Sequence, residues 1–247
     1  MAKGINWNVR LKPRDKKFLS GPGTKWQEFK YASSVLMEFI KGFRALHRIG
    51  PCITVFGSAR FTEEHPYYKD AYQVGKKISE LGLTVMTGGG PGIMEAANRG
   101  AFENGGRSVG CNIYLPTEQL ANKFMHKWVE IKYFFVRKAL LIKYSYGFII
   151  MPGGVGTMDE FFETLTLIQT RTLQHFPVVM IGKAYYQDIW EMLQKMLLQK
   201  TISAEDMDLV LFTDDINEAM DHIKFYIEKN YELDKMKPLE QLIDKFF

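Results

Sequence analysis

The sequence is poor in cysteine and contains no long apolar run. Its 247 residues include two cysteines, Cys52 and Cys111, which excludes the dense disulfide framework of small secreted domains. No apolar run reaches the about 20 residues of a transmembrane helix, and the first residues lack the apolar segment of a signal peptide. These absences predict a cytoplasmic protein without a membrane span. Both cysteines fall in expected core strands, where a free thiol behaves as a small hydrophobic group, although a single disulfide between them stays open.

The patterns of a metal site and of the common nucleotide-binding motifs are also missing. The histidines lie far apart, without H-x-x-x-H spacing or a neighbouring cysteine pair. They are His47, His65, His126, His175 and His222. The G-x-x-x-x-G-K-[ST] pattern of P-loop proteins and the G-x-G-x-x-G pattern of dinucleotide-binding proteins are both absent. We therefore expect no metal and no cofactor.

The net charge of +4 conceals an uneven distribution. Residues 1–48 contain 11 Lys and Arg against 3 Asp and Glu, which leaves 21 against 25 in the rest of the chain. A basic arm can indicate nucleic-acid binding, but no helix-turn-helix, zinc-finger or RNA-recognition signature accompanies it. We therefore favour an arm that docks on an acidic neighbouring surface over a nucleic-acid partner.

Apolar runs and helical patterns alternate along the chain. This order predicts an α/β fold, a Rossmann-like doubly wound parallel sheet flanked by helices, with an N-terminal helical extension. The expected strands are 51–57, 83–86, 108–113, 147–151, 177–181 and 209–212, with a weaker candidate at 128–134. The expected helices are 26–48, 66–82, 93–104, 135–146, one that opens at 157, 185–199 and 215–229.

The chain divides into three expected parts. Residues 1–49 form a basic arm and a helix, residues 50–229 a Rossmann-like nucleotide-binding domain, and residues 230–247 a charged tail with a short apolar helix. The first part carries an apolar stripe at helical spacing, which must be buried on the main domain or on another subunit. The stripe comprises Val35, Leu36, Phe39, Ile40, Phe43 and Leu46.

The most informative stretch follows the expected strand 147–151. Three glycines occupy a strand-to-helix turn there: Gly153, Gly154 and Gly156. Unpaired N–H groups and the positive end of the helix dipole make such a turn an anion site, to which Thr157 adds a hydroxyl donor. A bound phosphate would repel Glu160, so we expect this carboxylate to point past the phosphate, at hydroxyls or at a water. The arrangement suits a nucleoside monophosphate.

Small residues follow two other expected strands. They are Gly57 with Ser58, and the run Gly88, Gly89 and Gly90. Because the carboxyl ends of parallel strands meet at one edge of a sheet, we expect these residues to complete a mononucleotide cleft. Glu95, in the first turn of the next helix, is expected to complement the helix dipole rather than to act in catalysis.

Arg137 and Lys138 occupy the first turn of the expected helix 135–146, where cations oppose the helix dipole. The conflict is resolved if Arg137 faces a bound anion or a purine. We prefer this interpretation to a solvated pair of bases.

The nonapeptide PGGVGTMDE matches the pattern PGGxGTxxE. Together with the Arg-Lys pair before it, this stretch resembles the signature of the LONELY GUY family, the cytokinin riboside 5'-monophosphate phosphoribohydrolases once labelled possible lysine decarboxylases. The resemblance covers roughly residues 50–215. It implies hydrolysis of the N-glycosidic bond of an adenine or N6-prenyladenine nucleoside 5'-monophosphate, which releases the free base and ribose 5-phosphate.

The resemblance also implies roles for individual residues. Glu160 and Arg137 match catalytic positions, and Lys138 matches the companion of the arginine. Thr166 matches a further ligand position, and Glu118 lies in the loop where the family supplies another substrate-contacting acid. A carboxylate at Glu160 can stabilise an oxocarbenium-like transition state or position the attacking water. Arg137 cannot act as an acid, because its pKa lies above about 12, but it can hold the phosphate or stabilise charge on the departing base.

Two departures from the family pattern stand out. Asp159 replaces the first glutamate of a common Glu-Glu pair, and the N-terminal arm is longer than in the plant-type proteins, as in the longer bacterial type. Family active sites lie near a subunit interface, so the resemblance implies a homo-oligomer, a dimer or larger.

Other functions stay open at this point. A carrier of a phosphorylated ligand, such as a molybdenum-cofactor precursor, would share the fold but has no need for the pair of Arg137 and Glu160. A decarboxylase would need pyridoxal phosphate on a lysine with a matched acid, and no such lysine stands near the turns. AMP and a prenylated ribotide remain alternative substrates. An apolar slot for a prenyl group has candidates in Phe134, Phe135, Met94 and Met158.

Overall fold

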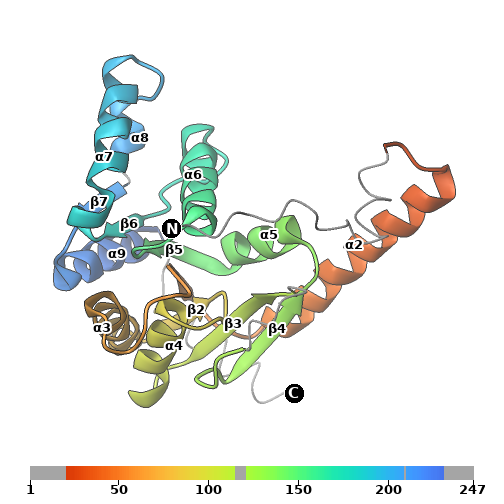
Figure 1. The fold of residues 1–247 in the computed structure, drawn as a ribbon, viewed down its shortest axis with the longest axis horizontal. Helices are drawn as coiled ribbons and strands as arrows, with labels where there is room; N and C mark the ends of the chain where they lie inside the picture. The colour runs from red at the N-terminus through yellow and green to blue at the C-terminus, as the bar shows by residue number, and fades with distance from the viewer. Residues whose placement is uncertain (1–20, 115–120, 209, 231–247) are drawn as a thin grey trace, which may run out of the picture.

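The computed structural model describes residues 21–114, 121–208 and 210–230. Its strands form one parallel sheet in the order β4-β3-β2-β1-β5-β6-β7 (Figure 1). The strands are β1 (Cys52–Phe56), β2 (Thr84–Thr87), β3 (Ser108–Ile113), β4 (Lys127–Ile131), β5 (Ser145–Ile150), β6 (Val178–Ile181) and β7 (Val210–Thr213). The weak candidate strand at 128–134 is thus the edge strand β4.

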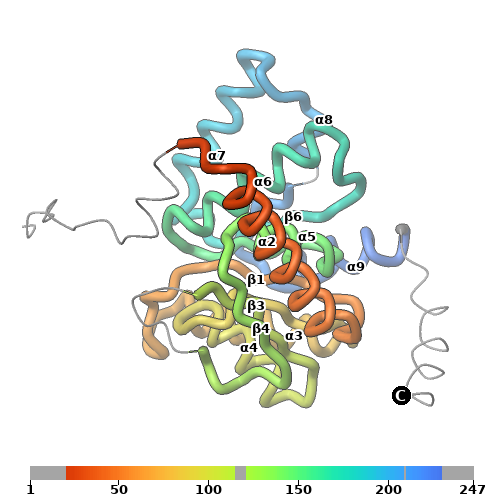
Figure 2. Tube along the Cα trace, turned by 90° about the vertical axis from the view of Figure 1, so that its right-hand side faces the viewer, coloured from red at the N-terminus to blue at the C-terminus, as the bar shows by residue number. Residues whose placement is uncertain are grey.

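Helices cover both faces of the sheet, which confirms the doubly wound α/β fold. They are α2 (Lys25–Leu46), α3 (Pro66–Glu80), α4 (Ile93–Glu103), α5 (Phe134–Tyr144), α6 (Val155–Gln169), α7 (Lys183–Leu198), the short α8 (Ala204–Met207) and α9 (Ile216–Asn230). One apolar core joins one face of the sheet to α3, α4 and α9, and the other joins the opposite face to α2, α5, α6 and α7. Figures 1 and 2 show α3 and α4 on the side of the sheet opposite α6 and α7.

The central strands are buried on both faces, as their continuous apolar sequences require. Every residue of β1, β2, β3 and β6 is buried. β4 lies at an edge, and its pattern of exposed and buried residues shows partial cover. A sheet buried on both faces leaves its carboxyl edge as the accessible place for a ligand.

The order in which strands are added to the sheet reverses between β1 and β5, which forms a topological switch point. From β1 it builds β2, β3 and β4 outward on one side, and it then returns to place β5 against the other side of β1. The carboxyl ends of the two strands are in register, with Phe56 opposite Ile150. Ligands of open α/β sheets bind in the crevice at such a switch point. The Gly57-Ser58 turn and the PGG turn both follow directly on these strand ends.

Several element boundaries differ by two or three residues from those expected from the sequence, among them the end of β4 at Ile131 and the start of α7 at Lys183. Helix α5 ends at Tyr144 and β5 begins at Ser145, so Tyr146 belongs to the strand and not to the helix. Helix α6 begins at Val155, two residues before the expected start. The four-residue helix α8 was not expected. The expected C-terminal helix within 230–247 and residues 1–20 of the N-terminal arm lie outside the described residues.

Helix α2 is held at one end and exposed at the other. Thr24 and Gln27 form a capping box at its start, and Leu46 near its end is fully buried in the core. The helix extends past the edge of the sheet (Figure 1), and Phe29 and Leu36 are each about 60% exposed. The expected burial of the apolar stripe is therefore only partly met within one chain.

Both cysteines are free and buried. Burial raises the pKa of each thiol to about 12, with nearby Arg107 and Arg137 opposing the shift at Cys52 and Cys111 respectively. The two side chains are therefore thiols that pack as small apolar groups, and no disulfide joins them. Among the described residues, no helix is both long and apolar enough to cross a membrane.

Candidate active site

The PGG turn is held by its carbonyl groups. The hydroxyls of Tyr186 and Tyr185 donate to the carbonyl oxygens of Met151 (2.8 Å) and Gly153 (3.0 Å). Between them, the carbonyl of Pro152 accepts from the N–H of Ser58 at 3.0 Å. Helix α6 then begins with Gly154 as its N-cap, and the Gly154 carbonyl accepts from the first helical amides. Four consecutive carbonyls are thus satisfied on the protein side of the turn.

The N–H groups of the same turn are unpaired. Within the described part of the chain, the amides of residues 153–156 donate no hydrogen bond, and residues 154–156 are exposed. A helix start leaves such donors without a partner, and the positive end of its dipole adds to their attraction for an anion. The turn therefore presents several main-chain donors to one small volume of solvent.

Thr157 is buried against the turn. A Cβ atom on Gly153 would lie 2.2 Å from the Thr157 hydroxyl oxygen, so only glycine allows this approach. By contrast, a Cβ on Gly154 or on Gly156 would meet nothing within 4 Å. Gly153 is thus needed for packing inside the turn, while the other two keep the approach to the main chain open.

Glu160 lies on the buried face of α6. It is 4% exposed, and it shares this face with Thr157 and Thr164. One carboxylate oxygen of Glu160 accepts no hydrogen bond from any described residue. A buried acid with an unpaired oxygen is costly, so it marks a place where a ligand or a water completes the polar contacts.

Burial raises the pKa of Glu160 to about 7, which the positive charges of Arg137 and Lys138 oppose. The carboxyl group therefore changes its protonation state near neutral pH. The side chains of a helix tilt toward its N-terminus, so the carboxyl of Glu160 is directed back toward the turn. The rise from Val155 to Glu160 is about 7.5 Å along the helix axis, at about 1.5 Å per residue.

The side chain of Arg137 contacts β3 and the glycine turn that follows β2. Its Nε donates to the carbonyl of Cys111 at 2.8 Å. A Cβ on Gly88 would lie 2.2 Å from a terminal guanidinium nitrogen and 2.8 Å from the sulfur of Met94. The guanidinium group of Arg137 therefore packs directly against Gly88, where any larger residue would collide with it. The charge of Arg137 lowers the pKa of Glu160, which places both groups in one electrostatic site.

Lys138 turns away from Arg137 toward the exposed face of α6. Its ammonium group forms ion pairs with Asp159 (3.1 Å) and Glu163 (2.5 Å). Burial alone would lower the pKa of Lys138, but the hydrogen bonds to Glu163 and Asp159 outweigh it and raise this pKa. The three side chains border an open groove of about 700 Å³, which Thr166 also lines. Lys138 and Thr166 are thus brought together at an open groove on the exposed side of α6, whereas Glu160 lies on its buried face.

The other small residues expected in the cleft have partners of their own. Ser58 gives its N–H to the PGG turn, and Gly89 gives its N–H to the Thr87 hydroxyl at 2.9 Å. A Cβ on Gly57 would collide with Ile93 at 2.3 Å. The carbonyl of Gly90 accepts a hydrogen bond from the side-chain Nδ2 of Asn122 at 3.1 Å. These turns border the cleft, but two of their amides are used inside the protein.

Several other sequence expectations can be placed. Glu95 accepts a hydrogen bond from the Tyr68 hydroxyl at 3.2 Å, which gives it a structural partner. Phe134 and Phe135 are about half exposed at the start of α5, and Met158 lines the groove beside Lys138. Glu118 lies outside the described residues. No cluster of three metal-ligating side chains occurs in the described ranges.

Sequence reasoning missed the tyrosines of α7 and a buried polar network beneath the second glycine turn. In that network Asn98 contacts the side chains of Thr87, Ser108 and Asn122 at 2.5 to 3.0 Å. The only available signal was an asparagine within an otherwise apolar helix face. For Tyr185 and Tyr186 the signal was a pair of polar rings at the start of the expected helix 185–199.

Comparison with known proteins places the chain in a family. The chain matches a family described as "possible lysine decarboxylase" over residues 94–223, just over half of its length. It is 25% identical over 189 residues to a probable cytokinin riboside 5'-monophosphate phosphoribohydrolase from Oryza sativa, covering 75% of this chain and 76% of that protein. It is 27% identical over 176 residues to a cytokinin riboside 5'-monophosphate phosphoribohydrolase from Rhodococcoides fascians, covering 70% and 88%.

Solved structures share the fold. A molybdenum cofactor carrier protein from Chlamydomonas reinhardtii superposes with a TM-score of 0.54 at 23% identity, covering 72% of this chain and 98% of that one. A molybdenum cofactor binding protein from Rippkaea orientalis gives a TM-score of 0.53 at 21% identity, covering 72% and 96%. At these identities the likeness concerns the arrangement of strands and helices.

Proposed function

Because the chain belongs to the LONELY GUY family, whose description reads "possible lysine decarboxylase", we propose that it hydrolyses the N-glycosidic bond of a purine nucleoside 5'-monophosphate. The products are the free base and ribose 5-phosphate. The curated relatives named above carry the corresponding activity in their names.

One observation carries the proposal. A buried carboxyl group with an unpaired oxygen follows the unpaired amides of the PGG turn on the same helix. The amides suit a phosphate, and the acid lies about 7.5 Å further along the axis, tilted back toward them. A nucleotide whose 5'-phosphate rests on the turn therefore has its ribose between the phosphate and Glu160.

The chemistry follows from this placement. The bond between the anomeric carbon and the base nitrogen breaks with both electrons going to the base, and positive charge develops on the ribose. Ionised Glu160 stabilises that charge or holds the water whose oxygen adds to the anomeric carbon. The water supplies a hydroxyl to the sugar and, in balance, a proton to the base. Arg137 stabilises negative charge, on the phosphate or on the departing base.

The direct test is the release of adenine and ribose 5-phosphate from AMP by the purified protein, followed by chromatography. A panel of AMP, GMP and N6-prenyladenine ribotide then defines the preferred base. Equal amounts of the two products are expected. Tight binding of AMP without either product would instead favour a carrier of a phosphorylated ligand.

The carrier alternative and the decarboxylase description fit the site less well. A carrier gains nothing from a buried, unpaired acid such as Glu160, whose cost needs a compensating role. A Schiff base needs a lysine that loses its proton easily. Lys138 is instead held as a cation by Asp159 and Glu163.

We expect the turnover of AMP to fall as the pH drops below about 7. Burial raises the pKa of Glu160 to about 7, so the reactive carboxylate predominates above this pH and the neutral acid below it. At saturating AMP, the turnover number should approach a tenfold loss per pH unit below the pKa. Initial rates between about pH 5 and pH 9 measure the curve. A turnover number that stays constant through this range would remove Glu160 ionisation from the mechanism.

We also propose that the protein is a homo-oligomer and that the exposed face of α2, within the arm of residues 1–49, takes part in the contact. Trp26, Phe29 and Met37 are each about 60% exposed, which is unusual for three large apolar side chains on one helix. Light scattering should give a mass of at least twice the 28.6 kDa of one chain. The double variant Trp26→Glu with Phe29→Glu should weaken the assembly.

The matched control is Phe225→Glu, since this phenylalanine of α9 is similarly exposed but lies on another part of the surface. Its mass should equal that of the wild type. A wild-type monomer at all working concentrations would contradict the proposal, and an unchanged mass in the α2 variant would move the contact elsewhere.

A further inference from the structure

The two tyrosines of α7 contact the PGG turn from the side opposite the expected ligand. Tyr186 is 1% exposed and holds the Met151 carbonyl, while Tyr185 is 46% exposed and holds the Gly153 carbonyl. Neither hydroxyl contributes to the apolar packing of its ring. Both donate to the main chain of residues 151–153, directly beside the amides of 153–156, which donate no hydrogen bond to any described residue. Their position is thereby tied to the function of the turn.

We propose that Tyr185 is a positioning residue that aims the Gly154 N–H at the ligand phosphate. The inference rests on the proposed function, because it takes the turn as the phosphate site. Tyr185 touches no reacting atom in this scheme. It acts through the peptide group that joins Gly153 to Gly154.

The direction of that N–H follows from the planarity of the peptide. In a trans peptide the carbonyl of one residue and the N–H of the next point in opposite directions. The structure contains no cis peptide among its described residues. With the Gly153 carbonyl bound to Tyr185, the Gly154 N–H must therefore point away from α7. The same rule applies one step earlier, where Ser58 binds the Pro152 carbonyl and thereby directs the Gly153 N–H away from β1.

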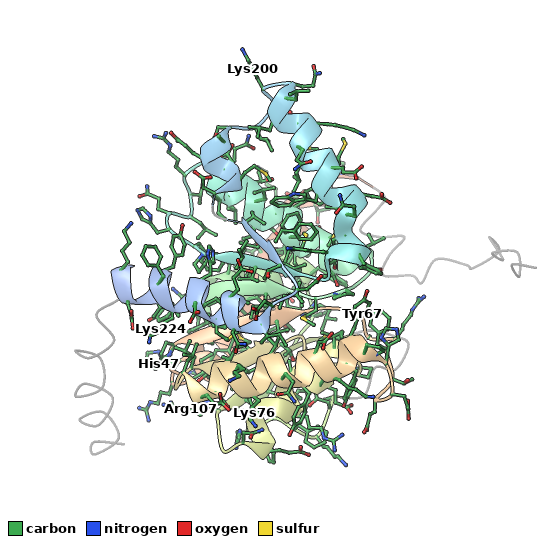
Figure 3. The ribbon with its side chains drawn as sticks, turned by 90° about the vertical axis from the view of Figure 1, so that its left-hand side faces the viewer. His47, Tyr67, Lys76, Arg107, Lys200 and Lys224 are labelled. Carbon is green, nitrogen blue, oxygen red and sulfur yellow. The ribbon has the colours of Figure 1, made fainter. Side chains whose placement is uncertain are left out.

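Tyr185 is itself fixed by the start of α7. Asp214 accepts hydrogen bonds from the N–H groups of Gly182 (3.0 Å) and Lys183 (2.8 Å), which anchors the beginning of the helix. The ring of Tyr185 packs edge to face against Tyr67, with centroids 6.1 Å apart. Figure 3 shows Tyr67 at the end of α3 that faces the start of α7. The hydroxyl thus reaches the turn from a fixed ring.

A peptide between two glycines turns over easily when nothing holds it. Gly154 has φ −92°, and rotation of the peptide plane by half a turn would bring this angle to about +90°. Glycine accepts that value at little cost, whereas any other L-residue resists it. Without the Tyr185 hydroxyl, the flipped peptide would present a carbonyl oxygen, instead of an N–H, to the phosphate. Tyr185 prevents this exchange of a donor for an acceptor.

The test is the binding of ribose 5-phosphate, measured by calorimetry with ribose as the unphosphorylated control. Tyr185→Phe removes only the hydroxyl, and we expect it to weaken the affinity about tenfold, the effect of losing one hydrogen bond to a charged group. Tyr67→Phe is the matched control, since its ring lies beside Tyr185 and its hydroxyl makes no hydrogen bond among the described residues. We expect its affinity to equal that of the wild type.

A double-mutant cycle separates positioning from general damage. A Cβ at Gly154 meets nothing within 4 Å at the present φ, but it disfavours the flipped peptide. In a Gly154→Ala background, Tyr185→Phe should therefore weaken binding by less than about threefold. An equal loss in both backgrounds, or no loss in Tyr185→Phe alone, would overturn the inference. A wild type that binds ribose and ribose 5-phosphate equally well would overturn the proposed phosphate site and this inference together.

Discussion

Glu160→Gln should reduce adenine release from AMP by about 1,000-fold or more while AMP still binds. The substitution keeps the size of the side chain and removes the negative charge that the transition state needs, a loss on the scale of the strongest electrostatic contributions in enzymes. Single-turnover rates measure the loss, and calorimetry measures the remaining affinity. Full turnover in this variant would exclude Glu160 from the reaction.

We expect Glu160→Gln to lose activity without losing stability. Because the folded protein raises the pKa of Glu160, the protonated form stabilises the fold, and this stabilisation is present at low pH and is lost as the pH rises through about 7. Above that pH the wild type carries a buried charge that the glutamine variant lacks. We therefore expect the melting temperature of Glu160→Gln at pH 8 to equal or exceed that of the wild type. Glu95→Gln is the matched control, since this acid follows the other glycine turn and already has a partner in Tyr68.

Arg137→Met should lower kcat/KM for AMP by about 100-fold to 1,000-fold, because it removes the cation that faces the developing negative charge. It should also shift the pH profile of the turnover number toward higher pH, since the charge of Arg137 lowers the pKa of Glu160. The same shift should appear in the pH profile of kcat/KM, which reports the free enzyme and the free substrate. The phosphate of free AMP titrates near about pH 6 with either protein, so a shift in that profile identifies the enzyme group.

Arg137→Lys should recover little of the activity. Lysine has no counterpart of the Nε donor that binds the carbonyl of Cys111. Its compact ammonium group also cannot replace the planar guanidinium that packs against Gly88. Arg99→Met is the control, because this arginine forms surface ion pairs with Glu63 and Glu103 and makes no hydrogen bond or ion pair with the PGG turn or with Glu160 among the described residues. A wild-type pH profile in Arg137→Met would show that Arg137 does not act on Glu160.

The order and kind of the elements could be predicted because every strand except the edge strand β4 is a short apolar run, and most helices carry a clear apolar face. The boundary between α5 and β5 could not. No glycine or proline separates the two, and the apolar sequence runs on through Ser145 and Tyr146. The early start of α6 is likewise a tertiary effect, since Val155 and Gly156 have poor intrinsic helix propensity. Helix α8 is too short to show a period.

The part of the candidate site that could be predicted is the part where the residue pattern has a single physical interpretation. Glycines at a strand end, followed by a helix, indicate an anion site, and the structure leaves the amides of 153–156 unpaired. The uses of Gly57, Gly88 and Gly89 were not readable, because glycine also serves close packing, as it does here beneath Arg137. The burial of Glu160 and the contacts of Tyr185 depend on the folded arrangement, so no local pattern reveals them.

The central claim is that main-chain donors of the PGG turn hold a 5'-phosphate and so bring the glycosidic bond to Glu160. The most direct measurement compares kcat/KM of the wild-type protein for AMP and for adenosine under the same conditions. The account predicts a preference for AMP of at least about 1,000-fold, because adenosine lacks the group whose binding energy positions the ribose. Equal values for the two substrates would contradict it.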